Sequence, residues 1–242
     1  GREVNFLKAG ILWADVLTTV SPTYARQIQT PEFGFGLDGL LRSRREALHG
    51  ILNGADYEVW DPRVDPFLPV RYDEHHLEGK GRCKRHLSRQ LGLAPDRPLL
   101  GFVGRLCEQK GVDLLLEAWR ELRALGTSLV VLGSGQERLE RALRERGNDG
   151  HMAVHLGFNE ALAHRIVAGC DLLLIPSRYE PCGLGQMIAL RYGTIPIVRK
   201  TGGLADTVFE TGDKPNGFVF EEYTPQALEA ALQRAVQAFA DK

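Results

Sequence analysis

From about residue 96 onward, short apolar runs alternate with longer segments in which apolar residues recur at helical spacing. The run at 99–103 is apolar throughout, which is typical of a strand buried on both faces. In the segment after it, Val112, Leu115 and Trp119 follow the period of a helix. Further runs of strand type stand at 128–132, 153–156, 171–175, 194–198 and 217–220, and a helix is expected from Thr224 to about Phe239. The pattern predicts an α/β fold, a Rossmann-like parallel sheet with flanking helices.

The pattern before residue 96 is less regular. Residues 7–14 have helical spacing, residues 15–20 are of strand type, and the pair Ser21-Pro22 is a helix-start signal. Residues 30–95 are rich in proline and glycine. We interpret that segment as a long functional loop and a linker rather than part of a core.

Composition excludes several classes of function. The 242 residues carry 30 basic and 31 acidic side chains with no long run of one sign, so no nucleic-acid partner is expected. No apolar run approaches the roughly 20 residues that cross a membrane, and no signal peptide is apparent. The 4 cysteines are scattered and no Cys/His pair has zinc spacing, which favours a reducing, intracellular compartment and no metal site.

Ligands of open α/β sheets collect at the carboxyl ends of the strands, so we looked for chemistry just after each predicted strand. After Val103, the turn at 104–111 carries Arg105 and Lys110, which could both reach one diphosphate. The alternative is a helix-start turn whose charges are merely solvated. After Leu132, a glycine turn at 133–135 could let the backbone approach a ligand, although a tight connection without a ligand is the more common meaning.

The segment at 176–186 is the most informative of these places. Glu180 stands where a helix is about to begin, beside Gly183 and Gly185. A sugar could meet the carboxylate while a phosphate meets the backbone N–H groups of the helix start. The alternative is that Glu180 is only a favourable charge near a helix N-terminus. Cys182 could be a reactive thiol, but a packed structural cysteine is the better interpretation.

Other candidates are more open. Thr201 and the two glycines after it follow another strand, either as a phosphate or hydroxyl cradle or as a simple N-cap with flexible glycines. Phe158 lies just past a strand and could stack on a planar base, with a core aromatic as an equal alternative. A structural role is favoured for His155 and His164.

Together these motifs resemble the bacterial glycogen synthase and plant starch synthase family, retaining glycosyltransferases with two Rossmann-like domains. The resemblance spans nearly the whole chain and includes TVSPTYA at 19–25, RLCEQKG at 105–111, GFNE at 157–160, SRYEPCGLGQ at 177–186 and TGGLADTV at 201–208, with shorter matches at 5–11, 30–34, 36–41 and 50–54. Such a series in order is far more specific than any single loop.

The resemblance implies roles for particular residues. Arg105 and Lys110 look like the family's pair that holds the nucleotide diphosphate and stabilises its departure, and Glu180 looks like its sugar-binding carboxylate. These three are the expected catalytic residues. The expected substrate-binding residues, which contribute to the phosphate, adenine and glucose subsites, are Gly104, Gly133, Phe158, Cys182, Gly183, Leu184, Gly185, Thr201, Gly202 and Gly203.

The activity that the resemblance implies is transfer of glucose from ADP-glucose to the non-reducing end of an α-1,4-glucan, with retention. It implies no cofactor and no metal beyond the nucleotide-sugar donor. UDP-glucose stays open as an alternative donor. The expected location is the cytoplasm, with the plastid stroma as the alternative.

The resemblance also predicts how the chain is organised. The family's N-terminal phosphate loop and active-site histidine have no counterpart here, and Ala55 replaces the usual isoleucine of its hinge motif. We therefore expect residues 1–52 to be the tail of an N-terminal domain, 53–95 a hinge and linker, and 96–242 the nucleotide-sugar domain. The missing domain would be a partner, and the isolated chain would be inactive. A non-catalytic nucleotide-binding half-domain and a glucan-binding scaffold are the alternatives.

Overall fold

The computed structural model describes residues 5–147 and 149–240, and the domain predictions that include residues 1–4, 148 and 241–242 lie outside them at those positions. Its main body is a sheet of six parallel strands in the order β5-β4-β3-β6-β7-β8. The predicted α/β fold class is thereby confirmed. The strands are β3 (Leu99–Val103), β4 (Ser128–Gly133), β5 (Met152–Leu156), β6 (Leu172–Ile175), β7 (Ile195–Arg199) and β8 (Phe218–Phe220).

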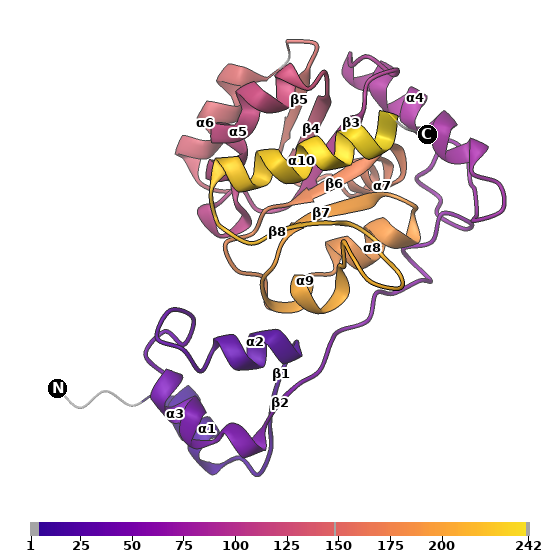
Figure 1. Ribbon diagram of the computed structural model, residues 1–242. Helices are drawn as coiled ribbons and strands as arrows, with labels where there is room; N and C mark the ends of the chain where they lie inside the picture. The colour runs from indigo at the N-terminus through magenta and orange to yellow at the C-terminus, as the bar shows by residue number, and fades with distance from the viewer. Residues whose placement is uncertain (1–4, 148, 241–242) are drawn as a thin grey trace.

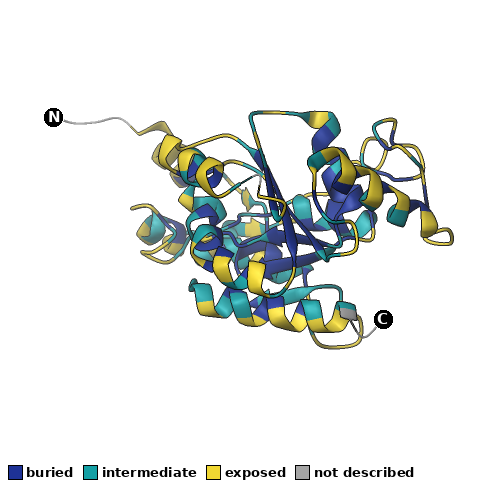
Figure 2. Cartoon of the chain, turned by 90° about the horizontal axis from the view of Figure 1, so that it is seen from above, coloured by how far each residue is buried: buried dark blue, intermediate teal, exposed yellow. Residues whose placement is uncertain are grey.

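Helices cover both faces of this sheet (Figure 1). One face carries α5 (Val112–Ala124), α6 (Glu137–Arg146) and α10 (Pro225–Ala240), and the other carries α4 (Glu78–Leu91), α7 (Glu160–Gly169) and α8 (Gly185–Arg191). Because the sheet is covered on both sides, most residues of its central strands β3, β4, β6 and β7 are buried (Figure 2). This explains why they read as continuous apolar runs in the sequence.

Side chains alternate between the two faces along each strand. Leu100 and Phe102 of β3 pack with α5 and α10, whereas Leu99 packs with α4 and α7. Gly101, between Leu100 and Phe102, leaves room for α7, since an added Cβ at this position would lie 2.9 Å from Ile166 Cγ2. The helix layer therefore lies close against the centre of the sheet.

The strand order fixes where a ligand crevice forms. Counted along the chain, β3 is the first strand of the sheet and β6 the fourth, and these two are neighbours at its centre. The chain leaves β3 toward one edge of the sheet and returns to build the other edge from β6. The loops that follow β3 and β6 diverge at this point, which opens a crevice at the carboxyl ends of the strands.

The N-terminal residues form a separate lobe below the sheet (Figure 1). A two-stranded parallel sheet of β1 (Leu17–Thr19) and β2 (Leu48–Gly50) is flanked by α1 (Phe6–Trp13), α2 (Pro22–Gln27), α3 (Asp38–Ser43) and the 3₁₀ turn η1 (Arg45–Ala47). The Ser21 hydroxyl caps α2 by accepting a bond from the Tyr24 N–H, 3.0 Å away. The lobe contacts the body where α2 meets α9 (Gly202–Thr207).

The interpretation of residues 30–95 as loop and linker without a core role is wrong for a large part of this segment. Residues 78–91 form α4, whose Cys83 and Leu87 are buried against α7. Upstream of α4, the buried Asp65 carboxylate accepts hydrogen bonds from Tyr192 (2.6 Å) and His164 Nδ1 (2.7 Å). Burial alone would raise the pKa of Asp65, but these bonds outweigh it and lower the pKa.

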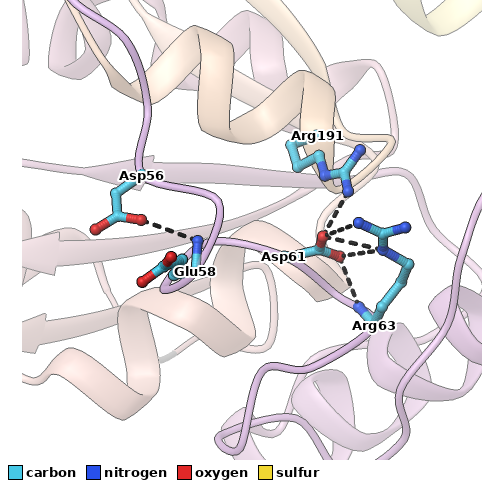
Figure 3. Close-up of polar contacts among 5 residues, drawn as sticks. All are labelled: Asp56, Glu58, Asp61, Arg63 and Arg191. Carbon is cyan, nitrogen blue, oxygen red and sulfur yellow. Dashed lines mark hydrogen bonds and ion pairs between the residues drawn. The ribbon is translucent and has the colours of Figure 1, made fainter.

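A second buried carboxylate ties the segment after the lobe to α8 (Figure 3). Asp61 accepts hydrogen bonds from Arg63, whose Nε lies 3.0 Å from Oδ2, and from Arg191 at the end of α8. The bonds from Arg63, together with those from Arg191, hold the pKa of Asp61 well below its usual range against the effect of burial. Nearby, Asp56 accepts from the Glu58 N–H at 2.9 Å, which shapes the turn. The segment is therefore anchored to the body.

Within the described residues, no helix has the length and apolar character needed to span a bilayer.

Candidate functional site

The loops after β3 and β6 touch through their backbones. An added Cβ at Gly111 would lie 2.1 Å from the Pro176 carbonyl oxygen, and Gly111 has a φ of 77°, so glycine is required on both counts. The Arg178 N–H donates to the Gln109 carbonyl at 2.9 Å. This contact brings the predicted residues of the two loops together.

Lys110 and Glu180 form an ion pair at the floor of the crevice. The Lys110 Nζ lies 2.6 Å from Glu180 Oε2, and the same oxygen accepts a bond from the Ser177 hydroxyl at 2.9 Å. The Glu180 residue is only 7% exposed. Because a buried carboxylate needs a positive partner, Lys110 and Glu180 each hold the other in place. Ser177 was not predicted, since a serine after a strand has no distinctive pattern.

A cavity of about 90 Å³ lies beside this pair and is lined in part by Gly183, Leu184 and Gly185. The backbone N–H groups of Gly183 and Leu184 have no acceptor in the described part of the chain. Two unpaired N–H groups near an ammonium favour an anionic ligand. This agrees with the geometry expected for these residues, while their contact with a phosphate stays a prediction.

Gln186 is a further polar residue of this cavity that the sequence reasoning missed. Its Nε2 donates to the carbonyls of Cys182 (3.2 Å) and Gly183 (3.0 Å) and to the Thr207 hydroxyl (3.0 Å). The Oε1 atom is buried and has no partner among the described residues. Gln186 therefore fixes the loop and leaves one acceptor at the cavity.

A second cavity of about 280 Å³ is lined by Gly104, Arg105, Gly133 and Phe158, among others. Val103 lines both cavities, so they are adjoining parts of one crevice along the carboxyl edge of β4, β3 and β6. Phe158 is 91% exposed, so its alternative as a core aromatic is wrong. The Arg105 guanidinium donates to Gln109 Oε1 at 2.8 Å and has no ion pair in the described residues. The three predicted charged groups therefore flank a common crevice.

Thr201, Gly202 and Gly203 lie behind Glu180. The Gly203 N–H donates to the Glu180 carbonyl at 3.1 Å, and the Gly202 N–H donates to Gln27 Oε1 at 3.1 Å. The Thr201 hydroxyl accepts a bond from Gln27 Nε2, also at 3.1 Å, instead of capping α9. In this structure these groups position the Glu180 loop, and their predicted contact with a sugar stays a prediction.

The remaining candidates have structural settings. Cys182 is buried, and its backbone packs against Gly203. His164 is fully buried, stacks on Trp60 at 3.8 Å between ring centroids and bonds Asp65, which agrees with the structural role expected for it. His155 is exposed on β5. No cluster of three potential metal ligands occurs among the described residues.

Comparison with known proteins places this geometry in a family. The model of the family "Glycosyl transferases group 1" matches residues 84–238, and that of the "Starch synthase catalytic domain" matches residues 1–43. The chain belongs to the group 1 glycosyl transferases. Within them it is similar to glycogen synthases over about half of their length, and its fold matches about half of a starch synthase catalytic domain.

Individual relatives support this placement. This glycosyl transferase is 55% identical to a glycogen synthase of Anaeromyxobacter sp. strain Fw109-5 over 99% of its own length and 52% of the relative's. It is 54% identical to the glycogen synthase of Myxococcus xanthus over 98% of its length and 50% of the relative's. The chain thus spans about half the length of the curated relatives it matches.

Among solved structures, the catalytic domain of Starch Synthase IV from Arabidopsis thaliana, bound to ADP and acarbose, matches with a TM-score of 0.93 and 41% identity. The match covers 99% of this chain and 51% of that one. Anabaena HepE in complex with UDP and glucose matches at 18% identity with a TM-score of 0.67, covering 96% of this chain and 56% of that one, which shows the fold alone.

Proposed function

We propose that this chain is the donor-binding half of a glycogen or starch synthase that transfers glucose from ADP-glucose to the non-reducing end of an α-1,4-glucan, with retention. The observation that carries the proposal is the Lys110–Glu180 pair at the floor of the crevice, with Arg105 and Phe158 along its wall. Relatives named glycogen synthase support the glucosyl transfer. The starch synthase structure with ADP and acarbose supports ADP-glucose as the donor and a glucan as the acceptor.

The charges of the crevice suit the departure of a nucleoside diphosphate. Breaking the bond between the sugar and the phosphate leaves negative charge on the diphosphate while the ring becomes oxocarbenium-like. In our proposal, Arg105 and Lys110 hold the diphosphate and the free N–H groups of Gly183 and Leu184 contact its oxygens. A unit charge at 4 Å supplies about 4 kcal/mol at the effective dielectric of a protein surface.

The sugar and the base occupy the two ends of the crevice in this proposal. Glu180 accepts hydrogen bonds from glucose hydroxyls, and Gln186 Oε1 offers a second acceptor. Gly104, Gly133 and Phe158 frame the adenine, with the exposed ring of Phe158 stacked on it. Thr201 and the glycines after it close the glucose end. No metal or other cofactor takes part.

Removing either cation tests the proposal. In the full-length enzyme, Lys110→Ala or Arg105→Ala should lower kcat about 100-fold or more, because the lost charge acts on the leaving group in the transition state. Glucose transfer from ADP-glucose to a soluble glucan measures this. Arg120→Ala on the exposed side of α5 is the control and should leave kcat unchanged. Normal turnover by both crevice variants would refute the assignment.

We further propose that a polypeptide of these 242 residues binds the nucleotide without turning it over. The chain spans about half of its relatives, and in our proposal the acceptor needs the other half as well. A calorimetric titration with ADP, and another with a glucan, separates the possibilities. Binding of ADP alone supports a nucleotide-binding half. Binding of glucan alone would support a scaffold, and turnover of ADP-glucose by the 242-residue chain would contradict the proposal.

A further inference from the structure

A groove rich in arginine lies between α4 and α7 and shares no lining residue with the crevice. Its volume is about 770 Å³, and its lining includes Arg82, Arg85 and Arg89 of α4 and Arg165 of α7. None of its described lining residues is acidic; the others are proline, valine, histidine and glutamine. The function proposed above makes no use of this groove.

The helices fix the backbone positions from which these side chains extend. Arg82, Arg85 and Arg89 are spaced by three and four residues, which places them on one face of α4. The opposite face packs tightly on α7, since an added Cβ at Gly169 would lie 3.0 Å from Leu87 Cδ2. Across the groove, the Arg165 Nε donates to the Phe67 carbonyl at 3.0 Å. The positive groups are therefore presented by a rigid, packed layer.

The groove concentrates unbalanced positive charge on a chain whose net charge is −1. Several arginines elsewhere pair with carboxylates, as Arg141 does with Glu137 and Arg234 with Glu210. The four arginines of the groove have no ion pair within the described residues. Like charges held together repel one another, and a bound anion relieves that repulsion.

We propose that this arginine groove is a binding site for a small ligand that carries at least two phosphate groups. The guanidinium fork matches phosphate oxygens, and the volume lies in the range of small-molecule sites. At a rise of 1.5 Å per residue, Arg82 and Arg89 are about 10 Å apart along the helix axis. One phosphate group cannot lie close to both positions, so two phosphate groups fit the groove better. Because the chain has a net charge of −1 and the four arginines line a single groove, a long nucleic acid is a poorer fit.

Titration with inorganic tripolyphosphate tests the proposal. The triple variant R82Q/R85Q/R89Q should bind at least about 10-fold more weakly than the parent chain, because it loses charged hydrogen bonds to phosphate. The matched control R141Q/R144Q/R146Q removes the same charge from exposed positions of α6 and should change the affinity less than about 3-fold. Gln and Arg have similar helix propensities, so both helices should remain folded, as circular dichroism can check.

Two further arms locate the site and define the ligand. Lys110→Gln, in the crevice, should leave the groove's binding of tripolyphosphate intact. Arg85→Lys keeps the charge but loses the fork, and should show a smaller loss than the triple variant. Inorganic phosphate should bind much more weakly than tripolyphosphate.

Several results would overturn the proposal. Equal losses in the α4 and α6 triple variants would show non-specific attraction, and loss of all binding in Lys110→Gln would place the ion in the crevice. Phosphate binding as tightly as tripolyphosphate would contradict the need for two phosphates. Binding of a single-stranded oligonucleotide but not of tripolyphosphate would assign the groove to nucleic acid instead.

Discussion

Large apolar side chains are mostly buried in the six-stranded body, whereas several of them are exposed in the N-terminal lobe. In the body, β3 and β4 are buried on both faces. The exposed Phe158 side chain lines the crevice. In the lobe, Phe6 is 84% exposed, Trp13 85% and Phe35 71%, while Ile11 is the one buried residue of α1. Clustered exposed apolar side chains mark a surface that is normally covered. The central strands of the body are thus covered by helices, whereas the lobe leaves several large apolar side chains exposed.

The lobe is held to the body by hydrogen bonds from α2 and by edge contacts of the Phe33 and Phe35 rings with Tyr179. The Thr23 hydroxyl donates to Asp206 Oδ1 at 2.6 Å, and the Thr23 N–H donates to Oδ2 at 2.9 Å. Gln27 bonds both Thr201 and Gly202 at the start of α9. Helix α9 therefore bonds the Glu180 loop through Gly203 and contacts the lobe through Gly202 and Asp206.

The largest effect that sharpens this comparison comes from matched leucines. Leu115→Ala in α5, where the residue is fully buried, should lower the free energy of unfolding by about 2–5 kcal/mol, through lost burial and a cavity. Leu12→Ala in α1, where the residue is 51% exposed, should change it by less than about 0.5 kcal/mol. Urea denaturation of the 242-residue chain measures both. Equal losses at the two positions would mean that the lobe has a core of its own.

A smaller, local effect is expected at the joint between the regions. Asp206→Ala removes both acceptors of Thr23, and part-buried hydrogen bonds of this kind have a net worth of about 0.5–1.5 kcal/mol each. Amide hydrogen exchange should accelerate in α2 and β1 and stay unchanged in β3 and β4. Asp213→Ala, at an exposed loop position, is the control and should alter neither region. Acceleration throughout the sheet would show instead that the joint is part of the global fold.

The smallest effect concerns the pH dependence of the body. Lys80 of α4 donates to the Thr194 hydroxyl at 2.6 Å and to the Ala168 carbonyl at 3.0 Å, and burial lowers its pKa from 10.5 to about 8. Between pH 8 and 10.5 the unfolded chain keeps a proton that the folded chain has lost, so this group makes stability rise with pH in that window. In thermal unfolding experiments, the stability of Lys80→Met should lack this rise between pH 8 and 10.5. Identical pH profiles of variant and parent would contradict it.

The central sheet could be predicted because its strands are apolar on both faces and separated by helical periods. Each run, from 99–103 to 217–220, corresponds to a strand of the structure. Helix α4 was missed because its outer face is almost wholly charged and it contains two glycines, while only Cys83 and Leu87 of its apolar residues are buried. The spacing of those two residues and the left-handed Gly92 after the helix were the available signals.

The candidate site was predictable as far as topology decides it. Because β3 and β6 are adjacent, residues just after them meet, as Lys110 and Glu180 do. The pairing of Gln27 with Thr201 and Gly202 was not predictable, since it depends on how the end of α2 packs against the start of α9, 174 residues later in the chain. The Oε1 atom of Gln186 was missed for the same reason.

The close approach of Gly202 to the Glu180 carbonyl also limits which residues proteins with this fold can accept at that position. An added Cβ at Gly202 would lie 1.9 Å from that oxygen, and at a φ of 46° a side chain would be strained in any case. Any larger residue at this position would therefore displace the Glu180 backbone, and with it the Glu180 carboxylate. At the open mouth of the crevice, by contrast, the exposed Phe158 side chain can be exchanged without moving its neighbours, so variation is tolerated there more easily than at Gly202.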